Sequence, residues 1–260
     1  MRFGDCTTAA VMLEAALTSR SVGKAIVQNS RHQLPEGARG LAMTTADAQF
    51  FWSNHPGRQA WSNGYLESET SPHRQPILDA LGELGQPVGT VLDVGCNAGP
   101  LLKRLKMLGY SALGVDINAL AVDAAKAAGL NAIVGTVPEA IERLHPTSID
   151  AVVSCFALAY IDPSGIERTL RACLRVARVG LVLLEPTREP GSLVEPAYVR
   201  EQYVDWRHDY ISTLAAIADA EPPGRLRLDL TCRRTPWEGD ALNAITIARL
   251  TYGQPGEVMH

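Results

Sequence analysis

The sequence predicts an α/β fold in three α/β/α layers, with a doubly wound, mostly parallel sheet that ends in an antiparallel C-terminal hairpin. Strand-like and helix-like segments alternate from residue 91 onward, and strands joined by helices pair in parallel. One strand-like run, VGLVLLEP, is apolar throughout, as expected for a strand covered on both faces. The last two strand-like segments, 225–234 and 241–250, have only a polar connector between them, so they should pair antiparallel.

The parallel strands and their helices can be placed in order along the chain. The expected strands are 91–94, 111–116, 131–135, 149–158 and 179–186. The expected helices are 9–19, 72–84, 100–108, 118–128, 138–144, 162–178 and 209–220. Glycines that follow the apolar pattern are expected to end two of the helices, at Gly109 and Gly129. Polar residues that can accept a hydrogen bond from the first helical turn are the expected N-caps: Ser71, Asn118 and Asp162.

Length and composition indicate one large domain with an appendage. The chain has 260 residues, of which 46% are hydrophobic, enough for one sizeable core but not for two domains of typical size. Residues 1–70 are interpreted as a helical and aromatic N-terminal appendage that could act as a lid, and residues 71–260 as the main domain. The aromatic residues of the appendage that could cover a ligand are Trp52, Trp61 and Tyr65.

Charge and cysteine content exclude several classes of protein. A net charge of −4 argues against a general affinity for nucleic acid or for an anionic membrane. The five cysteines are scattered, without the spacing of a disulfide framework or a zinc site. No apolar run resembles a signal peptide or a membrane span. We therefore expect a cytoplasmic protein without a metal site, and a small molecule rather than nucleic acid as its partner.

A glycine motif follows the first strand, in the stretch VLDVGCNAGP. The spacing is D-x-G-x-x-x-G, formed by Asp93, Gly95 and Gly99, and it differs from the G-x-G-x-x-G of a dinucleotide-binding turn. An acid at the end of the strand would repel a pyrophosphate, but it suits a ligand that carries an ammonium and a sulfonium group. The motif therefore favours S-adenosylmethionine over a nicotinamide cofactor.

With this motif, and with Asp116 at the end of the second strand, the chain resembles the class I S-adenosylmethionine-dependent methyltransferases, which have a Rossmann-like fold. The resemblance implies that the turn, including Cys96 and Asn97, packs on the methionine part of the cofactor. It also implies that Asp116 accepts hydrogen bonds from both ribose hydroxyls. Three residues could contact the adenine and two could line the methyl-donor pocket: Ile117, Thr136 and Val137, and Cys155 and Phe156.

The chain departs from the family pattern at three positions. Asn97 stands where relatives often have glycine, and Thr136, with its neighbour Gly135, stands where many place an acid that touches the adenine amino group. Ala159 stands where many relatives carry a histidine. These departures leave the adenine contact open and remove one candidate base.

The candidate catalytic residues lie after the fourth and fifth strands. Residues 185–210 are rich in proline and aromatic residues, and we interpret them as an irregular loop that closes over the acceptor. His208 is the candidate base, because imidazole titrates near neutral pH, with Asp209 to orient it. The alternative makes His208 a surface residue and Asp209 a plain helix cap. Tyr160 is the second candidate, unless it only packs under the following helix.

The sequence thus predicts an enzyme that transfers a methyl group from S-adenosylmethionine to an oxygen or nitrogen of a small molecule, such as a sugar or secondary metabolite. One alternative is a cofactor-binding regulatory or assembly protein that has lost catalysis. A less favoured alternative is a nicotinamide-dependent oxidoreductase. A homodimer is also compatible with the sequence.

Overall fold

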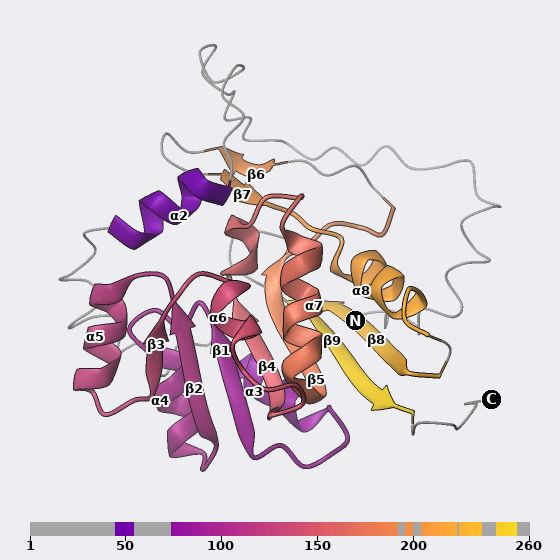
Figure 1. The fold of residues 1–260 in the computed structure, drawn as a ribbon, viewed down its shortest axis with the longest axis horizontal. Helices are drawn as coiled ribbons and strands as arrows, with labels where there is room; N and C mark the ends of the chain where they lie inside the picture. The colour runs from indigo at the N-terminus through magenta and orange to yellow at the C-terminus, as the bar shows by residue number, and fades with distance from the viewer. Residues whose placement is uncertain are drawn as a thin grey trace, which may run out of the picture.

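The computed structural model describes residues 45–54, 74–191, 196–199, 204–222, 224–235 and 243–253, and it has the predicted three-layer architecture (Figure 1). The main sheet has seven strands in the order β3-β2-β1-β4-β5-β9-β8. Its strands are β1 (Thr90–Val94), β2 (Ser111–Asp116), β3 (Ala132–Val134), β4 (Ile149–Cys155), β5 (Ala177–Pro186), β8 (Leu226–Arg234) and β9 (Asn243–Tyr252). The first five strands pair in parallel, and β9 pairs antiparallel with both β5 and β8. The predicted fold class is confirmed.

Helices cover both faces of the sheet because its central strands are apolar on both sides. The helices are α2 (Thr45–Asn54), α3 (Gln75–Gly82), α4 (Pro100–Met107), α5 (Ala119–Ala127), α6 (Glu139–Glu142), α7 (Ile166–Val176) and α8 (Tyr210–Asp219). In Figure 1, α6, α7 and α8 lie in front of the sheet, and α3 and α4 lie behind it. The burial of β5, from Val179 through Pro186, explains why this strand reads as a continuous apolar run.

Three helix boundaries test the expected caps. The Asn118 side chain accepts from the Ala121 amide at 3.1 Å and caps α5, as predicted. The prediction for Asp162 was wrong, because α7 begins four residues later, at Ile166. Asp162 instead accepts from the Ser164 amide at 2.9 Å and closes a separate turn. The prediction for Ser71 was also wrong, because α3 begins at Gln75 with Arg74 as its N-cap. The predicted helix over 9–19 lies outside the described residues.

The end of β4 also differs from the expectation that the strand runs to residue 158. Phe156 has a φ of 56°, in the left-handed region, which ends the strand and reverses the chain. The short 3₁₀ helix η4 (Leu158–Tyr160) follows directly. Apolar side chains alone could not reveal this reversal, because they suit a buried turn as well as a buried strand.

The segment between β5 and α8 is more regular than predicted. It contains two short antiparallel strands, β6 (Pro196–Val199) and β7 (Val204–Trp206), paired from Pro196 to Trp206. The expectation that its prolines prevent regular structure was wrong here. A proline can occupy the first position of an edge strand, where its missing N–H is not needed.

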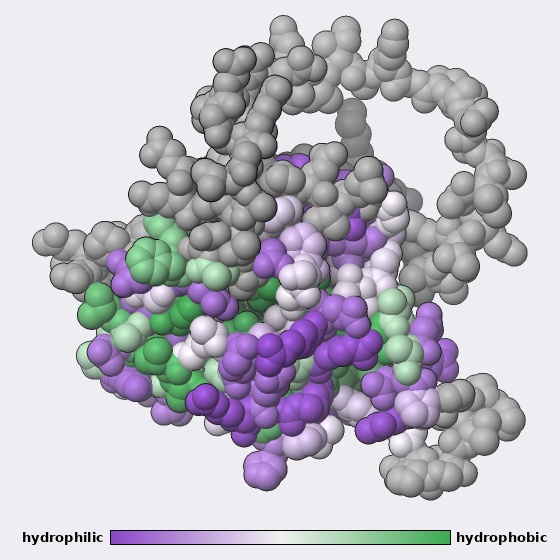
Figure 2. All heavy atoms as spheres, turned by 45° about the horizontal axis from the view of Figure 1, so that its top comes forward, coloured by the Kyte–Doolittle hydropathy of each residue, from purple (hydrophilic) through white to green (hydrophobic). Residues whose placement is uncertain are grey.

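Apolar side chains remain exposed at one end of the sheet. β3 is an edge strand, and Ile133 and Val134 on it are exposed, as is Leu120 on the neighbouring α5. Figure 2 shows green, hydrophobic residues gathered on the side of the molecule that carries α5 and β3 in Figure 1. The homodimer proposed from the sequence remains a prediction. Polar substitutions on this apolar edge can test whether two copies associate there.

Candidate functional site

The predicted cofactor residues come together at the carboxyl edge of the sheet. Val94 at the end of β1 stands opposite Val115 of β2 and Ser154 of β4. Asp116 at the end of β2 stands opposite Val134 of β3. The loops that follow these strands therefore begin side by side, where open parallel sheets bind their ligands.

The glycine turn after β1 depends on left-handed backbone conformations. Gly95, Asn97 and Gly99 have φ values of 75°, 52° and 84°. The amides of Gly95 and Cys96 both donate to the Val115 carbonyl, at 2.8 and 3.1 Å, which anchors the turn on β2. Asparagine enters the left-handed region more readily than most side chains. Asn97 can thus replace the glycine of the family pattern without changing the path of the turn.

Gly95 is also the point where the loops after β1 and β4 meet. A Cβ atom on Gly95 would lie 2.2 Å from the Cβ atom of Ala157. The turn therefore needs a residue without a side chain here for two reasons, the positive φ and the close approach of Ala157.

The Cys96 side chain points into the core rather than toward a ligand. It is 3% exposed, and its Sγ atom lies 2.5 Å from the position that a Cβ atom on Gly114 of β2 would take. Burial raises the pKa of the thiol far above its usual range. Any contact of Cys96 with a cofactor must come from its backbone.

Asp93 is a buried acid next to this turn. It is 2% exposed, and burial raises the pKa of its carboxyl to about 7, while the positive charge of Arg74 lowers it and Asp116 raises it further. Among the residues that the structure describes, none donates a hydrogen bond to the Asp93 carboxylate. A buried carboxylate without donors is costly, and a nearby cation would relieve that cost.

Asp116 organises the turn as well as facing the site. Its Oδ2 accepts from the Asn97 amide and its Oδ1 from the Asn118 amide, both at 2.8 Å. Burial raises the pKa of the Asp116 carboxyl, and these amides oppose that shift. Each carboxylate oxygen can accept a second hydrogen bond, so the half-buried Asp116 retains capacity for two hydroxyl groups.

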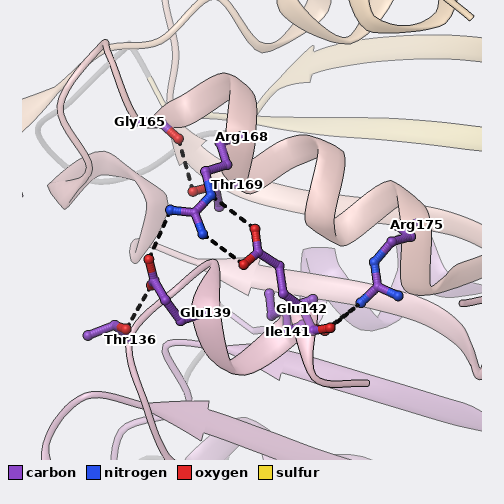
Figure 3. Close-up of polar contacts among 8 residues, drawn as sticks. All are labelled: Thr136, Glu139, Ile141, Glu142, Gly165, Arg168, Thr169 and Arg175. Atoms are coloured by element: carbon purple, nitrogen blue, oxygen red, sulfur yellow. Dashed lines mark hydrogen bonds and ion pairs between the residues drawn. The ribbon is translucent and has the colours of Figure 1, made fainter. Parts of the chain in front are cut away.

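A polar network holds the segment after β3 (Figure 3). The Thr136 hydroxyl donates to Glu139 Oε2 at 2.7 Å, and this bond is the main cause of the lowered pKa of the Glu139 carboxyl. Arg168 of α7 binds the other oxygen of Glu139 at 3.0 Å and pairs with both oxygens of Glu142. The proton of Thr136 is thus committed, and its oxygen is left as an acceptor.

His208 is buried, which excludes the alternative that it is a surface residue. It is 2% exposed, and its Nε2 donates to the Ile161 carbonyl at 2.9 Å. Burial lowers the pKa of its imidazole to about 4, so the ring is neutral near pH 7. Asp209 caps α8, because its Oδ1 accepts from the Ser212 amide at 2.8 Å. Its Oδ2 accepts from the Gly191 amide, also at 2.8 Å.

Tyr160 of η4 lies between the sheet and the N-terminal helix. Its ring and that of Trp52 in α2 have centroids 4.8 Å apart. Asn118, after β2, donates from Nδ2 to the Trp52 carbonyl at 2.7 Å. α2 therefore connects the segments that follow β2 and β4, above the carboxyl edge of the sheet (Figure 1). Trp61 and Tyr65, the other predicted aromatic cover, lie outside the described residues.

Two charged residues of the site were missed from the sequence. Glu185 is the second-last residue of β5, is 1% exposed and binds the turn after β4 through its carboxylate. Arg74 precedes α3 and exerts its charge on Asp93. A glutamate inside an apolar run, as in VLLEP, was a signal for Glu185, whereas no local pattern marks Arg74.

The described residues add two observations on metals and membranes. Within them, no group of three or more His, Cys, Asp and Glu side chains is placed to hold a metal ion. The helices of the described ranges are also too short or too polar to cross a bilayer.

The chain is similar to known methyltransferases. Residues 91–180 match a family model described as "Methyltransferase domain". The chain is 31% identical over 144 residues to the ubiquinone biosynthesis O-methyltransferase of Hahella chejuensis. That match covers 52% of this chain and 58% of the relative, so the chain spans little more than half of the relative's length.

Two solved structures have a similar fold. The phosphoethanolamine N-methyltransferase 1 of Haemonchus contortus, with phosphoethanolamine and S-adenosylhomocysteine, matches with a TM-score of 0.56 at 14% identity, over 83% of this chain and 51% of that chain. The 1,6-didemethyltoxoflavin-N1-methyltransferase of Burkholderia thailandensis matches with a TM-score of 0.54 at 18% identity, over 80% of this chain and 88% of that chain. At these identities the likeness concerns the fold alone.

The contact between Gly95 and Ala157 predicts a specific pattern of stability. Gly95→Ala should lower the free energy of unfolding by about 2–3 kcal/mol, since it combines a left-handed alanine with a steric clash. Gly85→Ala is the matched control, because Gly85 has a φ of 74° with open space around it, so that only the backbone cost applies.

Urea unfolding of these variants and of the Gly95→Ala, Ala157→Gly pair checks this prediction. The second change should restore the part of the loss that exceeds the Gly85→Ala control, in a double-mutant cycle that includes Ala157→Gly alone. Equal losses for Gly95→Ala and Gly85→Ala would show that the two loops do not press on each other.

Proposed function

We propose that this chain is a class I S-adenosylmethionine-dependent methyltransferase and that it transfers the methyl group of S-adenosylmethionine to an oxygen or nitrogen of a small molecule. The observation that carries the proposal is the pair of acids Asp93 and Asp116 beside the left-handed turn at Gly95, Asn97 and Gly99. A sugar or secondary metabolite is the acceptor class that we propose. The net charge of −4 gives no support to a nucleic-acid acceptor.

The residues at the edge of the sheet fit this cofactor. Asp93 is buried without hydrogen-bond donors from described residues, and an ammonium or sulfonium group would stabilise its ionised form. Asp116 keeps acceptor capacity on both oxygens for a pair of ribose hydroxyls. When bound, S-adenosylmethionine supplies an electrophilic methyl group to the acceptor.

The adenine ring would lie beside the segments that follow β2 and β3. The Thr136 oxygen, whose own proton is donated to Glu139, can accept from an amino group. The Thr136 oxygen would thus take the place of the acid that many relatives use to bind the adenine amino group. The backbone of Val137 and the half-buried side chain of Ile117 would contact the ring edge and the ring face.

The acceptor would be positioned at the ends of β4 and β5. Cys155 and Phe156 would line the methyl-donor pocket, and Tyr160 would stand at its border with α2. Trp52 of α2 would cover the site as part of a lid, because α2 contacts both Asn118 and Tyr160. Methyl transfer is an in-line displacement, so orienting the acceptor and excluding water supply much of the catalysis.

The relatives support a small-molecule acceptor without naming it. The Hahella relative is named for O-methyl transfer in ubiquinone biosynthesis, and the Burkholderia and Haemonchus structures are N-methyltransferases of small molecules. Both kinds of acceptor atom therefore occur among proteins with this fold.

Titration calorimetry followed by a transfer assay tests the proposal. The chain should bind S-adenosylmethionine and S-adenosylhomocysteine but not a nicotinamide dinucleotide, and it should transfer a labelled methyl group to a member of a panel of phenols, sugars and nitrogen heterocycles. Binding without transfer to any member would favour the regulatory alternative. Absence of binding to both sulfur compounds would contradict the proposal.

The ribose contact gives the first prediction for this function. Asp116→Ala should weaken S-adenosylhomocysteine binding by about 1–3 kcal/mol, because two hydroxyls lose their acceptor and the turn loses the anchor of Asn97. Calorimetry measures the affinity, and Asp123→Asn is the control because Asp123 is an exposed acid on α5. Unchanged affinity in Asp116→Ala would remove this residue from the cofactor site.

His208 can act as a base or can hold the chain in place, and two substitutions separate these roles. Burial lowers the pKa of His208 to about 4, and its Nε2 is occupied by the Ile161 carbonyl. Both features favour a positioning role for His208. Glutamine can still donate to that carbonyl but cannot act as a base.

We therefore expect His208→Gln to keep turnover within about threefold of the wild type and His208→Ala to lose about tenfold, measured with the acceptor that the panel identifies. The profile of kcat/KM against pH should show no inflection near 6.5 from this residue. A loss of about 100-fold in both variants would instead establish His208 as the base.

A further inference from the structure

The turn after β4 is held by one buried carboxylate, that of Glu185. Glu185 Oε1 accepts from the Ser154 hydroxyl at 2.7 Å and from the amides of Ala157 and Leu158 at 3.0 and 3.2 Å. Glu185 Oε2 accepts from the Ala159 amide at 3.2 Å. Three successive amides and one hydroxyl thus surround a side chain that is 1% exposed.

The backbone conformation at Phe156 brings these amides together. Phe156 is left-handed and Ala157 is right-handed, with φ values of 56° and −114°. Successive residues of opposite hand turn their N–H groups toward one point, where an anion can bind. The first amides of η4 have no partner within the helix, and Glu185 supplies that partner from the adjacent strand.

The same turn contacts the cofactor loop. Ala157 gives its amide to Glu185, and its Cβ atom fills the space beside Gly95 that a side chain there would need. At the other end of the turn, Tyr160 contacts Trp52 of α2, and the Ile161 carbonyl accepts from His208. The segment from residue 157 to residue 161 therefore lies between the glycine turn, α2 and the segment that leads into α8.

We propose that Glu185 is a positioning residue for methyl transfer, whose carboxylate holds residues 157–159 against Gly95 and thereby sets the shape of the cofactor site on the β4 side. The inference rests on the proposed function, because it takes the glycine turn as the cofactor loop. Glu185 touches no reacting atom in this scheme. It acts through Ala157 and through the path of the chain to Tyr160.

A purely structural role for Glu185 predicts different behaviour. If the carboxylate only stabilised the fold, its replacement would loosen the protein as a whole, and ligand affinity would follow global stability. If Glu185 positions the turn, its replacement should reduce the protection from amide exchange only at residues 157–159. The affinity for the cofactor should then fall in a protein that remains folded. Local amide exchange and cofactor affinity separate these two roles.

Glu185→Gln is the decisive variant, because it keeps the size of the side chain but replaces one acceptor oxygen with a donor group. Thr246→Val is the matched control, since Thr246 is 1% exposed on β9 beside β5 and its hydroxyl contacts Cys232 rather than the turn. Each variant is studied by hydrogen exchange, by calorimetry with S-adenosylhomocysteine and by thermal unfolding.

In Glu185→Gln, the amides of Ala157, Leu158 and Ala159 should exchange about tenfold faster or more, while those of Val152 and Leu183 in β4 and β5 stay protected. S-adenosylhomocysteine affinity should fall about tenfold. Thr246→Val should change neither quantity. If Glu185→Gln does not fold, Glu185→Asp is measured in the same way, because it keeps the charge but withdraws it from the turn, and it should shift both quantities in the same direction.

Two results would overturn the inference alone. The first is unchanged exchange at residues 157–159, and the second is faster exchange with S-adenosylhomocysteine affinity within about twofold of the wild type. Failure of the wild-type chain to bind S-adenosylhomocysteine would overturn the proposed function and this inference together. The exchange data would then still report whether Glu185 holds the turn.

Discussion

Gly95 and Ala157 belong to loops that follow the neighbouring strands β1 and β4, and the Cβ atom of Ala157 occupies the space that a side chain on Gly95 would need. This contact requires a glycine at the end of β1 and a small residue after β4. It also requires that both loops keep their paths, which Asp116 ensures on one side and Glu185 on the other. At the carboxyl edge of the sheet, the loop after β1 is therefore held by an acid of the neighbouring strand β2, and the loop after β4 by an acid of the neighbouring strand β5.

Much of this architecture follows from local sequence patterns. The parallel strands were predictable because each is a short apolar run between helix caps and glycines, and the C-terminal hairpin because no helix separates its strands. Asp93, Gly95 and Gly99 could be singled out because their chemistry and spacing suit a cationic ligand. Asp116 could be singled out because the chain resembles a family in which an acid at the end of the second strand holds the ribose. Asn118 was predictable as a cap because its function is local to one helical turn.

The features that escaped prediction depend on residues far apart in the chain. Glu185 binds amides 26 to 28 residues before it, so its role becomes visible only when β4 and β5 are adjacent. His208 was expected to be either a base or a surface residue, yet its ring is buried beside Tyr210 and its N–H donates to the Ile161 carbonyl. Phe156 reads as the continuation of a strand, and its left-handed backbone is understood only beside the amides of residues 157–159, which bind the distant Glu185.

The two most buried acids of the site, Asp93 and Glu185, show how the same electrostatic cost can serve different purposes. Burial raises the pKa of both carboxyls to about 7. Glu185 is compensated within the chain, by four hydrogen bonds that shape a turn. Asp93 receives no hydrogen bond from a described residue, and its main favourable interaction is the charge of Arg74. A buried carboxylate whose hydrogen bonds come from its own chain stabilises the conformation of that chain. A buried carboxylate that lacks donors from the described residues can instead be stabilised by a ligand with a positive charge. This contrast supports the proposals that Glu185 belongs to the framework of the site and that Asp93 faces the cofactor.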